Sequence, residues 1–268
     1  MTRGLGVLAA AAALAVLGCR AIPAPANGIL SLSTVELAAP AVVVGDTMRD
    51  SLGNAVPLRL YAFGSGGQAD TITDAEPTFI VLDRGAHVTQ AGYLVGDSAR
   101  STPVRIIGSV GVLQTSAVNV FVTPEPVSIA APGATTLDTV IFNGADSSAS
   151  VNFSQGLGVQ VTSPGTPSPV GVVGVIVHYA ITYAPAPTGS GASGLLVDAA
   201  GHPAAADTTD GSGNASLRIR VRPAAPAAQP DSFVVMASAA YRGVPLTGAP
   251  IRFVIPVRSV LAASGGTP

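Results

Sequence analysis

Alternation of apolar and polar residues with a period of two is the feature that most constrains the fold of this chain. Successive side chains of a β-strand point to opposite faces, so this period predicts strands with one buried face. In residues 216–222 (SLRIRVR), Leu217, Ile219 and Val221 are expected to point inward. The same pattern occurs in 56–63 (VPLRLYAF), 117–122 (AVNVFV) and 175–183 (VIVHYAITY), and the outward arginines are Arg218, Arg220 and Arg222.

Further strand-length runs fill most of the remaining chain. They lie at 78–83, 86–90, 92–97, 103–110, 233–241 and 251–257, and Gly, Pro, Asn and Asp separate them. Outside the first twenty residues, no segment carries an apolar stripe with the helical period of 3.6. Charged residues make up only 10% of the chain, against about 25% in an average globular protein. Many short strands with turn residues between them predict an all-β sandwich or barrel.

The first residues have the three parts of a secretion signal. Arg3 supplies a positive charge, residues 5–17 form an apolar run, and Gly18 and Cys19 close the run. The run is shorter than the roughly 20 residues that a membrane-spanning helix needs, so we interpret residues 1–18 as a signal peptide.

The end of this segment, Val16-Leu17-Gly18-Cys19, resembles the lipobox of bacterial lipoproteins. The resemblance implies cleavage before Cys19, a diacylglycerol on its thiol and an acyl chain on the new amino terminus. It therefore implies the membrane as a partner, with residues 19–28 as the lipidated terminus and a linker. Arg20 stands where an aspartate would imply retention at the inner membrane, which favours the outer membrane. Display outward or toward the periplasm stays open.

Composition excludes three further features. The 13 basic residues are all arginine and the formal net charge is −2, without the basic footprint of a nucleic-acid-binding protein. Aromatic residues make up 4% and tryptophan is absent, so a stacking platform for bases is not expected. Cys19 is the only cysteine, and an intrachain disulfide is therefore impossible.

Two regions resemble bacterial immunoglobulin-like domains. In the second half, GVQVTSPGTPSPVGVVGVIVHYAI, DTTDGSGNASLRIRV and DSFVVMASAAYRGVPLTGAPIRFVI resemble the invasin/intimin type. In the first half, VVVGDTMRDSL, FIVLDRGAHVTQAG and VNVFV resemble a more divergent group. The resemblance implies two tandem immunoglobulin-like β-sandwiches, at 29–124 and 125–258, with a Pro-containing connection at 123–127 and a disordered tail at 259–268. Residues 127–153 are either an extra strand pair of the second sandwich or an insert.

The invasin-type resemblance also implies a turn motif, T-D-x-x-G-x-A, that joins two strands. Thr209, Asp210, Gly213 and Ala215 match it. The Asp210 side chain is suited to capping the turn, and Gly211 and Gly213 to positive φ angles. Asp210, Ser212 and Asn214 also alternate as oxygen donors, but Ala215 and Val221 stand where a calcium loop needs Gly and an acidic residue. We therefore expect a turn and no metal.

The sequence predicts no catalytic site and no cofactor. His87, His178 and His202 lack the spacing of metal ligands, and no nucleophile elbow or phosphate-binding loop occurs. His178 is expected to be packed or at a sheet edge, and the other two solvated. Three functions remain: a non-catalytic envelope lipoprotein for adhesion to a protein or carbohydrate, a periplasm-facing structural subunit, and an enzyme with an unfamiliar site. We favour the first. The arginine row at 218–222 is expected to be a solvated face.

Overall fold

The computed structural model describes residues 29–64, 69–71, 77–143, 152–185, 193–222 and 231–260. Within these ranges the regular structure is β-strand, which confirms the predicted all-β fold. They contain no helix long and apolar enough to span a membrane.

The first part of the chain forms two facing sheets, with strand orders β1-β3-β4 and β2-β10-β8-β5. β9 pairs with β8, and β6 with β7. Inward residues of both sheets form one apolar core that includes Val35, Leu60, Ile106 and Val120. The strands are β1 (Ile29–Glu36), β2 (Ala41–Val43), β3 (Arg59–Gly64), β4 (Ala69–Thr71), β5 (Thr78–Val81), β6 (Ala86–Val88), β7 (Leu94–Gly96), β8 (Val104–Val110), β9 (Leu113–Gln114) and β10 (Val118–Thr123).

The second part also forms two facing sheets, with orders β11-β13-β18-β16 and β12-β22-β19-β15-β17. Its separate core includes Leu157, Leu217, Phe233 and Phe253. The strands are β11 (Ser128–Ala130), β12 (Val140–Asn143), β13 (Leu157–Ser163), β14 (Val170–Gly171), β15 (Ile176–Tyr183), β16 (Ser193–Val197), β17 (Ala206–Thr208), β18 (Asn214–Arg222), β19 (Asp231–Ser238), β20 (Ala240–Tyr241), β21 (Val244–Pro245) and β22 (Ile251–Val260).

Both sandwiches share one strand arrangement. The first two strands of each lie in different sheets, and the second of them pairs in parallel with the last strand. These parallel pairs are β2 with β10 and β12 with β22. The two apolar cores, each enclosed by two sheets of the same arrangement, make tandem immunoglobulin-like sandwiches. The stretch after residue 127 belongs to the second sandwich, because β11 adds a strand to one of its sheets and β12 adds a strand to the other.

The period-two prediction is confirmed along most of the strands that it covers. The exception is Tyr183, expected to point inward with Val177 and Tyr179 but 49% exposed, because the register of β15 shifts between Ile181 and Tyr183. Leu217, Ile219 and Val221 are at most 1% exposed, whereas Arg218 is exposed and Arg220 partly so. The side chain of Arg222 lies outside the described residues. Leu58, Leu60 and Ala62 are likewise buried. β22 continues to Val260, beyond the expected end at 258, because Ser259 and Val260 pair with β12.

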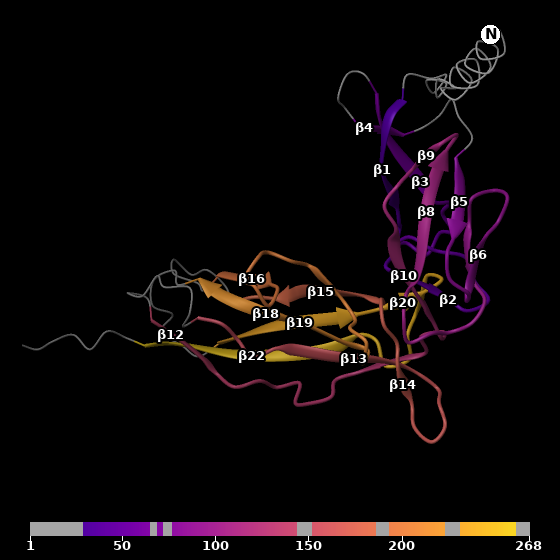
Figure 1. Cartoon of the computed structure of the whole chain (residues 1–268). Helices are drawn as coiled ribbons and strands as arrows, with labels where there is room; N and C mark the ends of the chain where they lie inside the picture. The colour runs from indigo at the N-terminus through magenta and orange to yellow at the C-terminus, as the bar shows by residue number, and fades with distance from the viewer. Residues whose placement is uncertain are drawn as a thin grey trace, which may run out of the picture.

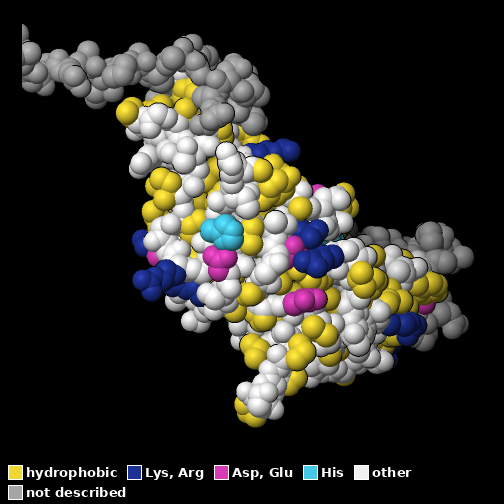
Figure 2. Space-filling view, turned by 90° about the vertical axis from the view of Figure 1, so that its right-hand side faces the viewer, with side chains coloured by type: hydrophobic (Ala, Val, Ile, Leu, Met, Phe, Trp, Pro, Cys, Tyr) yellow, Lys and Arg dark blue, Asp and Glu magenta, His cyan; other side chains and the backbone are white. Residues whose placement is uncertain are grey.

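The two sandwiches meet end to end in a bent arrangement (Figure 1). β1 begins at the end of the first sandwich that is farther from the second sandwich, and β4 lies at the same end (Figure 1). β2 and the β20–β21 hairpin lie where the two sandwiches meet (Figure 1). Figure 2 shows charged side chains in small separate groups on a surface that is mostly uncharged, and groups of both signs gather near the middle of that face.

Substitution of Phe233 tests whether the core of the second sandwich is packed as described. It is fully buried, and its ring lies over Gly194, where an added Cβ would approach the ring to 2.6 Å. Phe233→Ala removes this ring and leaves a cavity, so we expect the free energy of unfolding to fall by about 3–5 kcal/mol. Val244→Ala is the control, because Val244 is 65% exposed. Urea denaturation followed by circular dichroism measures both, and equal losses would contradict the assigned core.

Candidate functional site at the joint between the sandwiches

The carboxylate of Asp46 is the centre of the joint. Its Oδ2 accepts hydrogen bonds from Arg49 Nε at 2.7 Å, Tyr241 hydroxyl at 2.6 Å and Arg242 Nε at 2.9 Å. Its Oδ1 accepts from Arg49 Nη2 at 2.9 Å and from the Thr47 amide at 2.8 Å. Asp46 is only 6% exposed. Among the described residues, the two hydrogen bonds that cross between the sandwiches both end on this side chain.

Local turns place the first-sandwich half of the cluster. The chain leaves β2 through Gly45, whose φ of +75° lets it bend so that the Asp46 amide donates to Val43 O. The next turn begins at Asp50, whose Oδ1 accepts from the Leu52 and Asn54 amides. Arg49 Nη1 donates to Gly53 O at 2.8 Å, which ties this turn to the arginine that holds Asp46.

A tight hairpin supplies the other half. β20 and β21 are joined by Arg242 and Gly243, and their φ angles are +50° and +74°. Two positive φ angles suit a two-residue hairpin turn, where Asn or Gly usually stands. Arg242 is the one non-glycine residue with positive φ among those described. Its hydrogen bond to Asp46 and its guanidinium, 5.3 Å from the Tyr241 ring centroid, offset the strain of this conformation.

Glycines let the two backbones approach closely. An added Cβ on Gly53 would lie 2.8 Å from Gly243 N, and one on Gly174 would collide with Ala41. Each contact joins one sandwich to the other. The connection is also short and fixed, because Val127 N donates to Thr162 O and Thr247 N donates to Val127 O. The joint is therefore packed backbone to backbone as well as bonded through Asp46.

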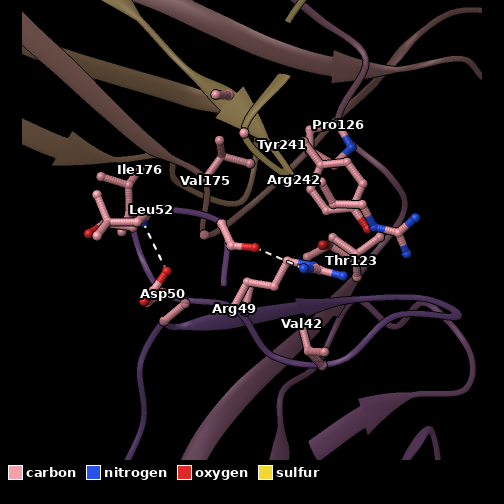
Figure 3. Close-up of a pocket in the computed structure, with 18 of the residues that line it drawn as sticks. Val42, Arg49, Asp50, Leu52, Thr123, Pro126, Val175, Ile176, Tyr241 and Arg242 are labelled. Carbon is pink, nitrogen blue, oxygen red and sulfur yellow. Dashed lines mark hydrogen bonds between the residues drawn. The ribbon is translucent and has the colours of Figure 1, made fainter. Parts of the chain in front are cut away.

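A cavity of about 140 Å³ remains beside the ion cluster. Figure 3 shows Arg49 on one wall of it, with Tyr241, Arg242 and Pro126 on the opposite side. Leu52 and Ile176 line its far end, and Leu52 is 78% exposed. The lining is mainly apolar, and most of the charge beside it is engaged in the Asp46 cluster.

Electrostatics keep the cluster in one protonation state. Burial of Asp46 opposes ionisation, but hydrogen bonds from Arg49, Arg242 and Tyr241 outweigh it and hold the pKa of the carboxyl well below its usual range. Burial and the Asp46 carboxylate raise the pKa of the Tyr241 hydroxyl. Hydrogen bonding to Asp46 raises the pKa of Arg242 further. Near neutral pH the cluster is therefore an anion, a neutral phenol and two cations, an arrangement of charges that stabilises the closed joint.

The four predicted turn residues lie together: Thr209, Asp210 and Gly213 stand between β17 and β18, and Ala215 lies at the start of β18. Asp210 Oδ1 accepts from the Ser212 and Asn214 amides at 2.8 and 3.0 Å. Thr209 is buried, and its hydroxyl donates to Val172 O and accepts from the Val175 amide. Gly213 has a φ of +80°, and Ala215 is buried in the core. Gly211 does not adopt positive φ, contrary to the expectation, because Gly213 alone makes the reversal. Cys19 lies outside the described residues.

Among the described residues, this turn with a leading aspartate occurs three times, which the sequence reasoning missed. In each copy, the backbone amide of the aspartate donates a hydrogen bond to the carbonyl oxygen of the residue four positions later. The copies are Asp50–Asn54, Asp198–His202 and Asp210–Asn214. In each copy, the aspartate side chain also accepts a hydrogen bond from the amide of that same later residue, and the glycine at the fourth position of the turn has a positive φ angle. The shared signal is D-x-x-G, as in DSLGN, DAAGH and DGSGN. The first copy presents Gly53 to the joint.

The joint residues themselves were not predicted. Asp46 and Arg49 lie in the VVVGDTMRDSL stretch, and Tyr241 and Arg242 lie in AAYRGVP, up to 196 positions apart. Nothing in a single sequence pairs such distant residues. The prediction for the histidines is confirmed in part. His87 and His202 are exposed as expected and face Asp97 and Asp198. His178 is neither packed nor at a sheet edge, because it is exposed and β15 pairs with a strand on each side of it. The described residues hold no group of three or more potential metal ligands.

Comparisons with known proteins match no family model and no curated protein. Among solved structures, the Yersinia pseudotuberculosis adhesin InvE is similar over 87% of this chain and 61% of its own, with 15% identity and a TM-score of 0.31. Domains 1–6 of the surface layer protein SbsC match over 87% of this chain and 29% of theirs, with 13% identity and a TM-score of 0.31. Zebrafish RET cadherin-like domains 1 to 4 match over 70% and 42%, with 11% identity and a TM-score of 0.32. This chain spans less than two thirds of each.

Asp46→Ala should weaken the joint. It removes the acceptor of five hydrogen bonds, four of them from charged or phenolic side chains, so we expect a loss of about 2–3 kcal/mol in the free energy of unfolding. Asp83→Ala is the matched control, because it removes the same charge from the exposed Asp83–Arg105 pair, 3.0 Å apart. Chemical denaturation should show a much smaller loss there, and similar losses would count against the joint.

The joint should also respond to acid in a defined direction. The pKa of Asp46 is lowered on folding, so its contribution is complete above about pH 4, the range of an unfolded aspartate, and is lost as the pH falls below it. The difference in unfolding free energy between the wild type and Asp46→Asn should stay constant from about pH 8 to pH 5 and shrink in more acid solution. A difference that grows toward low pH would contradict this assignment.

Proposed function

We propose that the chain is a non-catalytic lipoprotein of a bacterial cell envelope, in which two immunoglobulin-like sandwiches form a stiff, bent spacer. The spacer presents the second sandwich to a protein or carbohydrate ligand. The observation that carries the proposal is the Asp46 cluster, which ties both sandwiches through one buried, ionised carboxylate. Tandem domains usually move relative to one another unless their interface prevents it, so a built joint indicates that the spacing and bend matter.

The predicted anchor fits this geometry. β1 begins at Ile29, at the end of the first sandwich away from the joint (Figure 1). Cys19 precedes Ile29 by ten positions, and Pro23 and Pro25 favour an extended linker of about 3.1 Å per residue. Acyl chains on Cys19 would hold the first sandwich close to the membrane, because two or more chains give stable anchoring. The second sandwich would then project away from it.

A periplasm-facing structural subunit is the second candidate. β12 is the edge strand of its sheet, and it exposes Ile141 to 45%. An edge strand with an exposed apolar side chain is suited to pairing with a strand of another protein. This candidate shares the lipid anchor and differs in the direction of display.

Cys19→Ser tests the anchor. The substitution removes the thiol that the lipid would occupy, so the protein should move from the membrane fraction to the soluble fraction of the envelope. Intact-mass spectrometry of the wild type should show a chain that begins at Cys19 and carries acyl groups. Ser31→Ala, at an exposed position of β1, is the control and should remain in the membrane. An unmodified thiol on the mature wild-type protein would contradict the proposal.

Protease treatment of intact cells separates the two directions of display. A surface adhesin should be cleaved by added protease while a periplasmic marker remains intact. A periplasm-facing subunit should be cleaved only after the outer membrane is opened, and it should co-purify with fixed partners.

A further inference from the structure

The outer face of the β18 sheet carries a concave site that neither the joint nor the predicted turn uses. Arg218 and Arg220 project outward from β18, opposite the buried Leu217, Ile219 and Val221. They line a cavity of about 350 Å³ together with Phe153 and the turn that begins at Asp198.

The backbone holds Phe153 beside the arginines. Phe153 pairs with Arg220 in an antiparallel bridge, the Ser154 amide donates to Ile219 O, and the Val221 amide donates to Asn152 O. The Arg220 guanidinium lies 6.0 Å from the Phe153 ring centroid. These bonds extend the β13 edge along β18 and fix an aromatic ring at the side of a cationic pair.

The opposite wall has little negative charge to offer the arginines. Asp198 is the one acidic residue of the lining, and its Oδ1 accepts the His202 amide at 2.8 Å while Oδ2 lies 3.4 Å from His202 Nδ1. Its carboxylate is therefore engaged in its own turn. Among the described residues, neither Arg218 nor Arg220 forms an ion pair, so both guanidinium groups face the cavity with their donors available.

We propose that this cavity binds an acidic glycan through the carboxylate of a sugar ring. A guanidinium matches a carboxylate with two parallel hydrogen bonds, and an aromatic ring packs against the apolar face of a pyranose. The residues that line the cavity all belong to the second sandwich. Strands β16 and β18 of this sandwich lie away from the end of the first sandwich where β1 begins (Figure 1), and this placement favours a glycan over the headgroups of the anchoring membrane. The arginine row predicted to be only a solvated face thus becomes a binding site.

The inference rests on the proposed function, because it names the ligand class that the displayed sandwich would take. It is tested separately from membrane anchoring and display. The test uses the full chain in neutral detergent and measures binding to polygalacturonate, with its fully methyl-esterified form as the uncharged counterpart. The wild type should bind the acidic polymer at least about tenfold more tightly than the ester, because esterification removes the charge that the arginines recognise.

Variants then locate the binding. Arg218→Gln/Arg220→Gln should weaken binding to polygalacturonate by about tenfold or more. Arg252→Gln/Arg258→Gln removes the same charge from exposed positions of β22 and should change it by less than about twofold. Phe153→Leu keeps an apolar side chain but removes the aromatic face, and should weaken binding several-fold. Thermal unfolding checks that each variant folds.

Three results would overturn the inference. They are equal binding to the acid and the ester, equal losses in the two arginine pairs, or binding through Arg218 and Arg220 to phosphatidylglycerol vesicles in place of the polymer. Any of them leaves the results of lipid analysis and protease treatment unchanged, so a failure here is distinguishable from a failure of the proposed function.

Discussion

The structure depends on one buried carboxylate shared by two domains. Burial of an ionised group is costly unless donors satisfy it. Asp46 meets this condition only when the second sandwich supplies Tyr241 and Arg242 to complete the set begun by Arg49 and Thr47. The charge is therefore most stable when the joint is closed, and this coupling holds the two sandwiches together.

The rest of the joint follows from backbone chemistry. Gly53 and Gly174 remove the side chains that would keep the sandwiches apart, and Arg242 accepts a conformation that glycine or asparagine usually takes. The D-x-x-G turn serves two purposes in this chain. At Asp198 and Asp210 it joins strands within the second sandwich, and at Asp50 it carries Gly53 into contact with the neighbouring domain.

Much of the fold could be predicted from the sequence, because period two is a local signal. The alternation in 216–222 places Leu217, Ile219 and Val221 in the core, and the structure confirms it. The joint could not be predicted in the same way, since Asp46 and Arg242 have no local pattern in common and meet only after both sandwiches form. Arg218 and Arg220 are intermediate: their outward direction was predictable, but their neighbour Phe153 comes from a segment more than 60 positions away. The cavity forms because Phe153 pairs with Arg220 on a neighbouring strand, and the period-two pattern within one strand does not encode such pairing.

The most direct test measures how the two sandwiches are held relative to each other. Spin labels on cysteines introduced at Val112 and Ala199, both exposed and one in each sandwich, report the distance between them in a Cys19→Ser background. Double electron–electron resonance should give a single narrow distribution that broadens when Asp46→Ala is added. A distribution that is broad in the parent protein, or unchanged by loss of Asp46, would contradict the account.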